Sequence, residues 1–138
     1  MEWQELCVTL LPLGDHLSAV RIPGVLVHAA VGSDEPSVIA DCLAERLQGP
    51  VIHDPGFDRY YALVLSSTGP VCVPPGAEYL GSGTFLGVPR TDCTELNKGT
   101  LASYWAVPVS RPGALCALAD VCEFALLGRT LTNGEAES

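Results

Sequence analysis

The sequence is short of positive charge. Its 138 residues include 7 Lys and Arg against 16 Asp and Glu, which gives a formal net charge of -9. Nucleic-acid backbones and anionic membrane surfaces both attract clustered Lys and Arg side chains. The composition therefore argues against direct binding to nucleic acid or to membranes. It leaves basic protein partners, or a charge that serves solubility alone.

Long hydrophobic runs are also missing. The longest uncharged stretch, residues 60–77, contains three prolines and cannot form a membrane-spanning helix. The first fifteen residues carry acidic side chains where a secretory signal has positive charge, so we expect a cytoplasmic protein. With 48% hydrophobic residues, the chain can form one packed core. We expect a single domain over residues 1–131 and a disordered tail over 132–138.

Closely spaced cysteines are absent. The six cysteines form no C-x-x-C pair, so we expect reduced thiols that pack as small apolar groups. The segment HDPGFD brings His53, Asp54 and Asp58 together, and such a trio could bind a divalent metal. The same residues are common in turns, where Asp accepts backbone hydrogen bonds. We expect a turn there, with no metal site and no cofactor.

Recognised catalytic signatures are missing as well. No G-x-S-x-G segment occurs, and His28 lies in an apolar run where a packed histidine is expected. Residues 79–88, YLGSGTFLGV, look like the glycine-rich loop that covers ATP in protein kinases. However, the spacing of Gly81, Gly83 and Gly87 is one residue too long, and the other kinase motifs are absent. We expect a hairpin that turns at the SG pair, and the sequence favours a protein without catalytic activity.

Short strand patterns alternate with helical ones, which predicts an α+β fold with a mostly antiparallel sheet. One amphipathic helix is expected over 33–49, with Pro36 in its first turn, Ser33 or Asp34 as its cap, and Gly49 at its end. An apolar C-terminal helix is expected over 114–127. Residues 24–31 fit either a strand or a helix. The expected strands cover 6–13, 17–23, 50–54, 59–66, 78–81, 84–89 and 103–109.

The C-terminal helix is apolar on nearly every side. Such a helix is either buried on both sides or part of an interface, and the sequence leaves both possibilities open. Tyr and Trp also occur in adjacent pairs on two predicted strands, so one member of each pair can face a partner. The candidate interface residues are Tyr61, Trp105, Val121, Phe124 and Leu127. A small anion site is also possible beside these aromatics, at Arg21, Arg59 and Arg90.

Several segments together resemble a known group of proteins. LSAVRIP, GPVIHDP, RYYALVLSSTG, YLGSGTFLGVP and YWAVP lie between residues 17 and 109. They are similar to small actinobacterial proteins that are grouped with the N-terminal domain of bifunctional DNA primase/polymerase. The resemblance implies an α+β domain linked to DNA metabolism or mobile elements. The paired acids that primase chemistry needs at D-x-D spacing are absent, so the resemblance is to a relative without the catalytic residues.

The sequence therefore predicts a non-enzymatic, cytoplasmic interaction or regulatory protein. Its partner would be another protein or a second copy of the chain. One alternative is a nucleotide-handling domain related to primase/polymerase. Another is an acidic protein that occupies the basic, nucleic-acid-binding surface of a partner.

Overall fold

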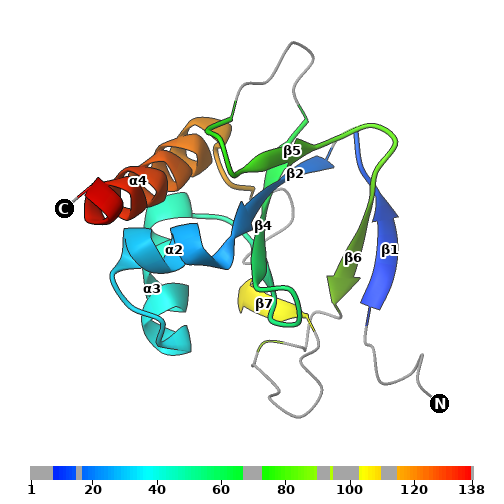
Figure 1. Ribbon diagram of the computed structural model, residues 1–138. Coiled ribbons are helices and arrows are strands. Elements are labelled where there is room, and N and C mark those ends of the chain that lie inside the picture. The colour runs from blue at the N-terminus through cyan, green and yellow to red at the C-terminus, as the bar shows by residue number, and fades with distance from the viewer. Residues whose placement is uncertain are drawn as a thin grey trace.

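The computed structural model describes residues 8–14, 17–66, 73–89, 94, 103–109 and 115–137. Within these residues, a five-stranded sheet has helices on one face and a two-stranded sheet beside it (Figure 1). Every strand pair is antiparallel. The predicted α+β class with a mostly antiparallel sheet is confirmed. Residues 90–102, apart from Thr94, lie outside the described residues.

The main sheet has the strand order β5-β2-β4-β3-β7. Its central strand, β4, alternates between the two faces, because Tyr60, Ala62 and Val64 face the helices while Tyr61 and Leu63 face the other way. The predicted turn over HDPGFD joins β3 to β4, and the two strands pair as expected. The strands are β2 (Leu17–Pro23), β3 (Val51–Asp54), β4 (Arg59–Leu65), β5 (Glu78–Leu80) and β7 (Tyr104–Val107).

A second sheet, which we call the ribbon, consists of β1 (Val8–Pro12) and β6 (Phe85–Pro89). The predicted hairpin between residues 78 and 89 is therefore wrong, because β5 pairs with β2 and β6 pairs with β1. A turn does occur at the SG pair: Thr84 N donates to Gly81 O at 3.0 Å, and Gly83 has a positive φ of 91°. The turn carries the chain out of the main sheet. Leu80 and Leu86 can then both be buried between the two sheets.

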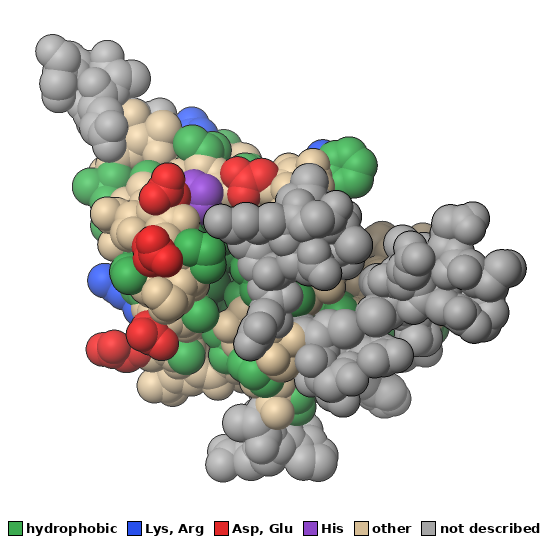
Figure 2. Space-filling view, turned by 90° about the horizontal axis from the view of Figure 1, so that it is seen from below, with side chains coloured by type: hydrophobic (Ala, Val, Ile, Leu, Met, Phe, Trp, Pro, Cys, Tyr) green, Lys and Arg blue, Asp and Glu red, His purple; other side chains and the backbone are tan. Residues whose placement is uncertain are grey.

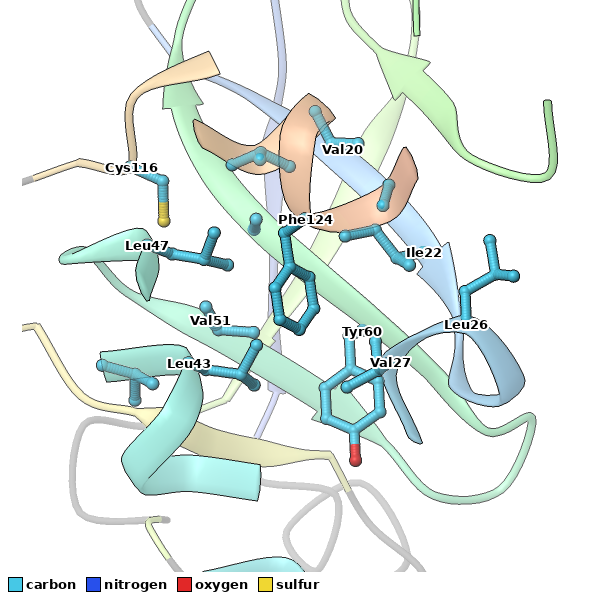
Figure 3. Close-up of a cluster of buried hydrophobic side chains, with 14 of the residues drawn as sticks. Val20, Ile22, Leu26, Val27, Leu43, Leu47, Val51, Tyr60, Cys116 and Phe124 are labelled. Carbon is cyan, nitrogen blue, oxygen red and sulfur yellow. The ribbon is translucent and has the colours of Figure 1, made fainter. Parts of the chain in front are cut away.

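Three helices cover the other face of the main sheet: α2 (Gly24–Val31), α3 (Pro36–Leu47) and α4 (Leu118–Glu137) (Figure 1). The ambiguous segment 24–31 is thus helical. The main core lies between these helices and the sheet. Figure 3 shows Phe124 of α4 in its centre, with its ring pointing among Leu43, Val27 and Tyr60.

The ends of α3 follow the sequence signals only in part. Pro36 lies in the first turn, as predicted. Ser33 Oγ accepts a hydrogen bond from Glu35 N at 3.0 Å, although the residue at the N-cap position is Glu35. At the other end, Gln48 takes the left-handed conformation with φ 57°. Gly49 is needed for a different reason, because a Cβ there would overlap the backbone of Cys116.

Helix α4 differs most from the prediction. It was expected to end before Gly128, but it continues to Glu137, through residues assigned to a disordered tail. Gly128 lies inside the helix, at the point where α4 crosses α2 closely. Glycine is required there because a Cβ would overlap the carbonyl oxygen of Leu26. The glycine therefore permits close helix packing and does not mark a helix end. Thr132 Oγ1 donates to Gly128 O at 2.8 Å within the extension.

A second, smaller core lies between the main sheet and the ribbon. It joins Leu63 and Ile52 of the main sheet to Leu86 of the ribbon. Trp105 of β7 belongs to this core, and its Nε1 donates to Pro89 O at 3.0 Å. The ribbon is therefore attached to the body of the protein by apolar packing and by a buried hydrogen bond. None of the helices in the described ranges combines the length and apolarity needed to cross a bilayer.

Candidate functional site

The outer side of the ribbon presents large apolar side chains to solvent. In the β1–β6 register, Leu10 lies opposite Gly87, and Pro12 lies opposite Phe85, so these four residues share one face. Leu10 is 68% exposed and Phe85 is 63% exposed, and Pro12 is exposed as well. We call Leu10, Pro12 and Phe85 the ribbon face. Neither ribbon strand contains a charged residue.

The opposite side of the ribbon is the one that folds onto the protein. Leu11 and Leu86 face each other across the ribbon, and Leu86 is buried in the smaller core together with Leu13. Strand residues alternate between two faces, so burial of this set leaves Leu10 and Phe85 on the outside. The exposure of Leu10 and Phe85 therefore follows from the alternation of side chains along the two strands.

The outer edge of β1 offers backbone groups at the same place. Leu13 N donates to Thr84 O at 2.9 Å, and this pair continues the β1–β6 register. Hydrogen-bonded pairs alternate along an antiparallel ladder, so Leu11 forms the next such pair, and the N–H and C=O of Leu10 point away from β6. Among the described strands, β1 pairs with β6 alone. Leu10 thus combines an exposed side chain with an available backbone edge.

Six exposed acids lie on the helix side, whereas Asp58 and Glu78 are exposed acids of the main sheet and one of its turns. In Figure 2, which looks at the molecule from below, the visible acidic side chains lie toward the side of the helices. Figure 1 shows the ribbon at the other side of the molecule. The acids on the helices and the ribbon face therefore lie on different sides of the molecule. The exposed acids of α3, of the segment before it and of α4 are Asp34, Glu35, Asp41, Glu45, Asp120 and Glu123.

A second polar feature lies where β3, β4 and β7 meet α2. His53 is 8% exposed, and its Nδ1 is 2.8 Å from the hydroxyl oxygen of Tyr104. Its ring stacks on Tyr60 with a centroid distance of 4.1 Å. Its Nε2 is 3.5 Å from Asp58 Oδ1 but has no hydrogen-bond partner among the described residues. We call His53, Asp58, Tyr60 and Tyr104 the His53 cluster.

Asp58 is held in place by its backbone and by α2. It adopts a positive φ of 53°, which Asp tolerates better than most residues. Its carbonyl oxygen accepts a hydrogen bond from Gly24 N at 2.7 Å, at the start of α2. Its carboxylate lies where a Cβ on Gly24 would be, so a larger residue at that position would require the Asp58 side chain to move. The acid near the helix N-terminus also complements the helix dipole.

Burial sets the protonation state of the His53 cluster. Desolvation lowers the pKa of His53, and the nearby carboxylate of Asp58 offsets this only in part. Burial raises the pKa of Tyr104 and of Tyr60, so both phenols keep their protons. A neutral imidazole between a phenol and a carboxylate can hold or pass one proton. Because His53 is buried, it is poorly placed to reach a substrate in solution.

The His53 cluster does not contain a metal site of the usual kind. The described residues hold no group of three or more His, Cys, Asp and Glu side chains that could bind a metal ion. The thiol of the buried Cys116 is not a reactive one, because burial and the nearby Asp120 raise its pKa to about 12. Within the described part of the chain, the His53 cluster is best explained as a polar link that joins three strands and α2.

The candidate interface residues from the sequence occupy different environments. Val121, Phe124 and Trp105 are buried in the cores of this chain, so their expected role at an interface is corrected. The physical reason for Val121 and Phe124 is that α4 packs its apolar side against α2 and the main sheet. Tyr61 and Leu127 are half-buried, and they lie on different sides of the main sheet.

The candidate anion-binding arginines are only partly brought together. Arg21 of β2 lies opposite Tyr61 of β4, and Arg59 is two residues before Tyr61, so all three share one face of the sheet. Arg21 forms an ion pair with Glu78, which neutralises much of its charge. The guanidinium of Arg59 lies 5.4 Å from the centre of the Phe57 ring. Arg90 lies outside the described residues, and the anion site stays a prediction.

The ribbon face was not predicted from the sequence. Its residues belong to LCVTLLPL and TFLGVP, where apolar residues follow one another without a polar alternation. A period-two pattern could not separate the buried side from the exposed one. A usable signal was the complete absence of charge from both segments, since edge strands of monomeric proteins usually carry charged residues.

The comparisons with known proteins give no relative for this chain. No protein-family model matches it, and no curated protein and no solved structure is significantly similar to it. The resemblance over residues 17–109 to proteins grouped with primase/polymerase therefore stays a prediction.

Proposed function

We propose that this protein acts by binding protein partners through the ribbon face and does not catalyse a reaction. The observation that carries the proposal is the exposure of Leu10 and Phe85 on a strand pair without charge. Burial of apolar surface away from water is favourable by about 25 cal/mol for each Å², so covering these side chains would stabilise a complex. Contiguous exposed apolar residues on a folded protein mark interaction surfaces.

The rest of the described residues offers little support for a catalytic role. The His53 cluster is buried and offers two side chains at most to a metal ion, whereas nucleotidyl transfer needs several carboxylates. The nucleotide-handling alternative predicts heat release on titration with nucleoside triphosphate and Mn²⁺. We expect no binding in that titration. A regulatory role in DNA metabolism is part of the proposal, and it rests on the sequence resemblance alone.

A second candidate function has one observation in its favour. The six exposed acids on the helix side give a surface that could occupy a basic, nucleic-acid-binding surface of a partner. That contact would be governed by charge, so it would weaken steeply with salt. Contact through the ribbon face would instead persist at high salt, which separates the two candidates.

The proposed function is tested by affinity capture from the native host with three single variants. Leu10→Asp and Phe85→Asp place a charge on the ribbon face, whereas Leu126→Asp places one on α4 at a residue that is 51% exposed. We expect the first two variants to lose at least nine-tenths of the captured partner, and the α4 variant to retain it. Capture that is equal for all variants, with circular dichroism showing each one folded, would refute the ribbon face as the binding surface.

A further inference from the structure

The backbone groups at the outer edge of β1 indicate which kind of segment could bind there. A strand edge accepts another strand, and Leu10 presents its N–H and C=O at that edge with an apolar side chain beside them. The backbones of Val8 and Pro12 have the same orientation as that of Leu10, because they are two residues away on either side. The edge is therefore symmetrical around Leu10, apart from the missing N–H of Pro12.

The distribution of charge selects the side on which two copies could meet. Each chain carries a formal net charge of -9, so two copies repel each other wherever their acids come close. The exposed acids of α3 and α4 lie on the helix side, whereas the ribbon strands carry no charge. An approach through the ribbon keeps the acidic helices of the two copies apart. An approach through exposed Leu126 would bring Glu123 of both copies together.

We infer that two copies of this chain pair through the outer edges of β1, related by a two-fold axis at Leu10. The two Leu10 residues exchange both backbone hydrogen bonds, and Val8 N–H of each copy donates to Pro12 C=O of the other. The product is a continuous sheet with the order β6-β1-β1-β6. This inference rests on the proposed function, because it names a second copy as the occupant of the ribbon.

Self-association of this kind fits the geometry of the ribbon. Directly opposite side chains in an antiparallel pair have Cβ atoms about 5 Å apart, so the two Leu10 side chains contact each other across the axis. The exposed Phe85 rings lie on the same face and extend the apolar strip on each side. A symmetrical contact of one surface with itself is the commonest way in which soluble proteins form dimers.

Analytical ultracentrifugation of the full chain tests the inference. We expect the wild-type protein to sediment as a dimer at tens of micromolar. Leu10→Pro removes the outward N–H but none of the β1–β6 hydrogen bonds, so it should raise the dissociation constant at least tenfold while the protein stays folded. Leu126→Asp is the matched control and should leave the dimer intact. Hydrogen exchange adds a local measurement, since the Leu10 amide should exchange more slowly in the dimer.

Each outcome decides the inference. Loss of the dimer in Leu10→Pro, with an intact dimer in Leu126→Asp, supports it. A dimer that survives Leu10→Pro but dissociates in Leu126→Asp overturns it and moves the contact to α4. A monomeric wild type at every concentration also overturns it. In that case the proposed function still stands if a host protein is captured by the wild type and lost in Leu10→Asp and Phe85→Asp, and it fails with the inference if no such protein is found.

Discussion

His53 shows how burial changes the acid–base behaviour of a single side chain. The groups that face it are Tyr104 at Nδ1, Asp58 at Nε2, Tyr60 on its ring face, and the charges of His28 and Asp54 nearby. Desolvation is the largest influence, and it lowers the pKa of His53 below its usual 6.5. The folded protein therefore binds a proton at His53 less readily than the unfolded chain does.

This difference predicts a loss of stability in mild acid. Below about pH 6.5 the unfolded chain protonates His53 first, so the free energy of unfolding decreases as the pH falls toward the folded-state pKa. The slope from this residue is at most about 1.4 kcal/mol per pH unit. Urea unfolding at a series of pH values from about 7.5 to about 5.5, the range in which histidine titrates, measures this slope.

The variant His53→Gln should have a shallower pH dependence than the wild type, because it removes the titrating group. His28→Gln is the comparison variant, since that ring is half-buried, has an edge contact with Tyr60, and is a lesser cause of the lowered pKa of His53 than desolvation. Equal pH dependence in the wild type and in His53→Gln would contradict the assignment. The role of His53 could not be predicted from HDPGFD, because Tyr104 is 51 residues away in the chain.

At the scale of elements, the crossing of α2 and α4 depends on a glycine inside a helix. Replacement of an exposed helical glycine by alanine usually stabilises a helix by about 1 kcal/mol. Gly128→Ala should do the opposite, because its methyl group would overlap the carbonyl oxygen of Leu26. We expect a loss of roughly 1–3 kcal/mol in the free energy of unfolding, measured with urea.

The exposed Thr130, two residues along α4, provides the matched control. Thr130→Ala should leave the free energy of unfolding unchanged or raise it slightly, because alanine has the higher helix propensity. A Gly128→Ala protein that is as stable as the wild type would show that the two helices do not pack so closely.

The elements differ in how far their sequence determines them. The hairpin β3–β4 was predicted correctly, because its pairing is local and its turn residues lie between two strand patterns. The partners of β1 and β6 were missed, because these strands are more than seventy residues apart and neither contains a signal for the other. Helix α4 was predicted too short, since Gly128 has the same local signature whether it ends a helix or allows a close crossing.

At the scale of the whole molecule, charge and apolar surface act in opposite directions. The net charge of -9 opposes the approach of two copies, whereas the apolar ribbon face and the β1 edge would favour the inferred pairing. If the inferred dimer forms through the uncharged ribbon, added salt should strengthen it, because salt screens the repulsion between the two chains. We expect the dissociation constant to fall several-fold between about 0.02 M and about 0.3 M sodium chloride.

Sedimentation at the two salt concentrations measures this effect, and Leu10→Pro should stay monomeric in both. Weakening of the dimer by salt would instead indicate that opposite charges hold the copies together. The sequence alone predicted a protein partner or a homodimer, and its composition gave the net charge. It could not show that the exposed acids of α3 and α4 and the ribbon occupy different sides, because that arrangement depends on the fold.

The hydrogen bond between Trp105 and Pro89 makes the fluorescence of Trp105 a probe of the contact between the ribbon and the body. Trp105 is buried where the ribbon meets the body, and its indole nitrogen is bonded to the last residue of β6. The only other tryptophan is Trp3, so a Trp3→Phe protein emits from this junction alone. Its emission would shift to the red if the ribbon separated from the body before the rest unfolded. Fluorescence and circular dichroism recorded during one denaturation would then show whether the ribbon and the helical body unfold as one unit or as two.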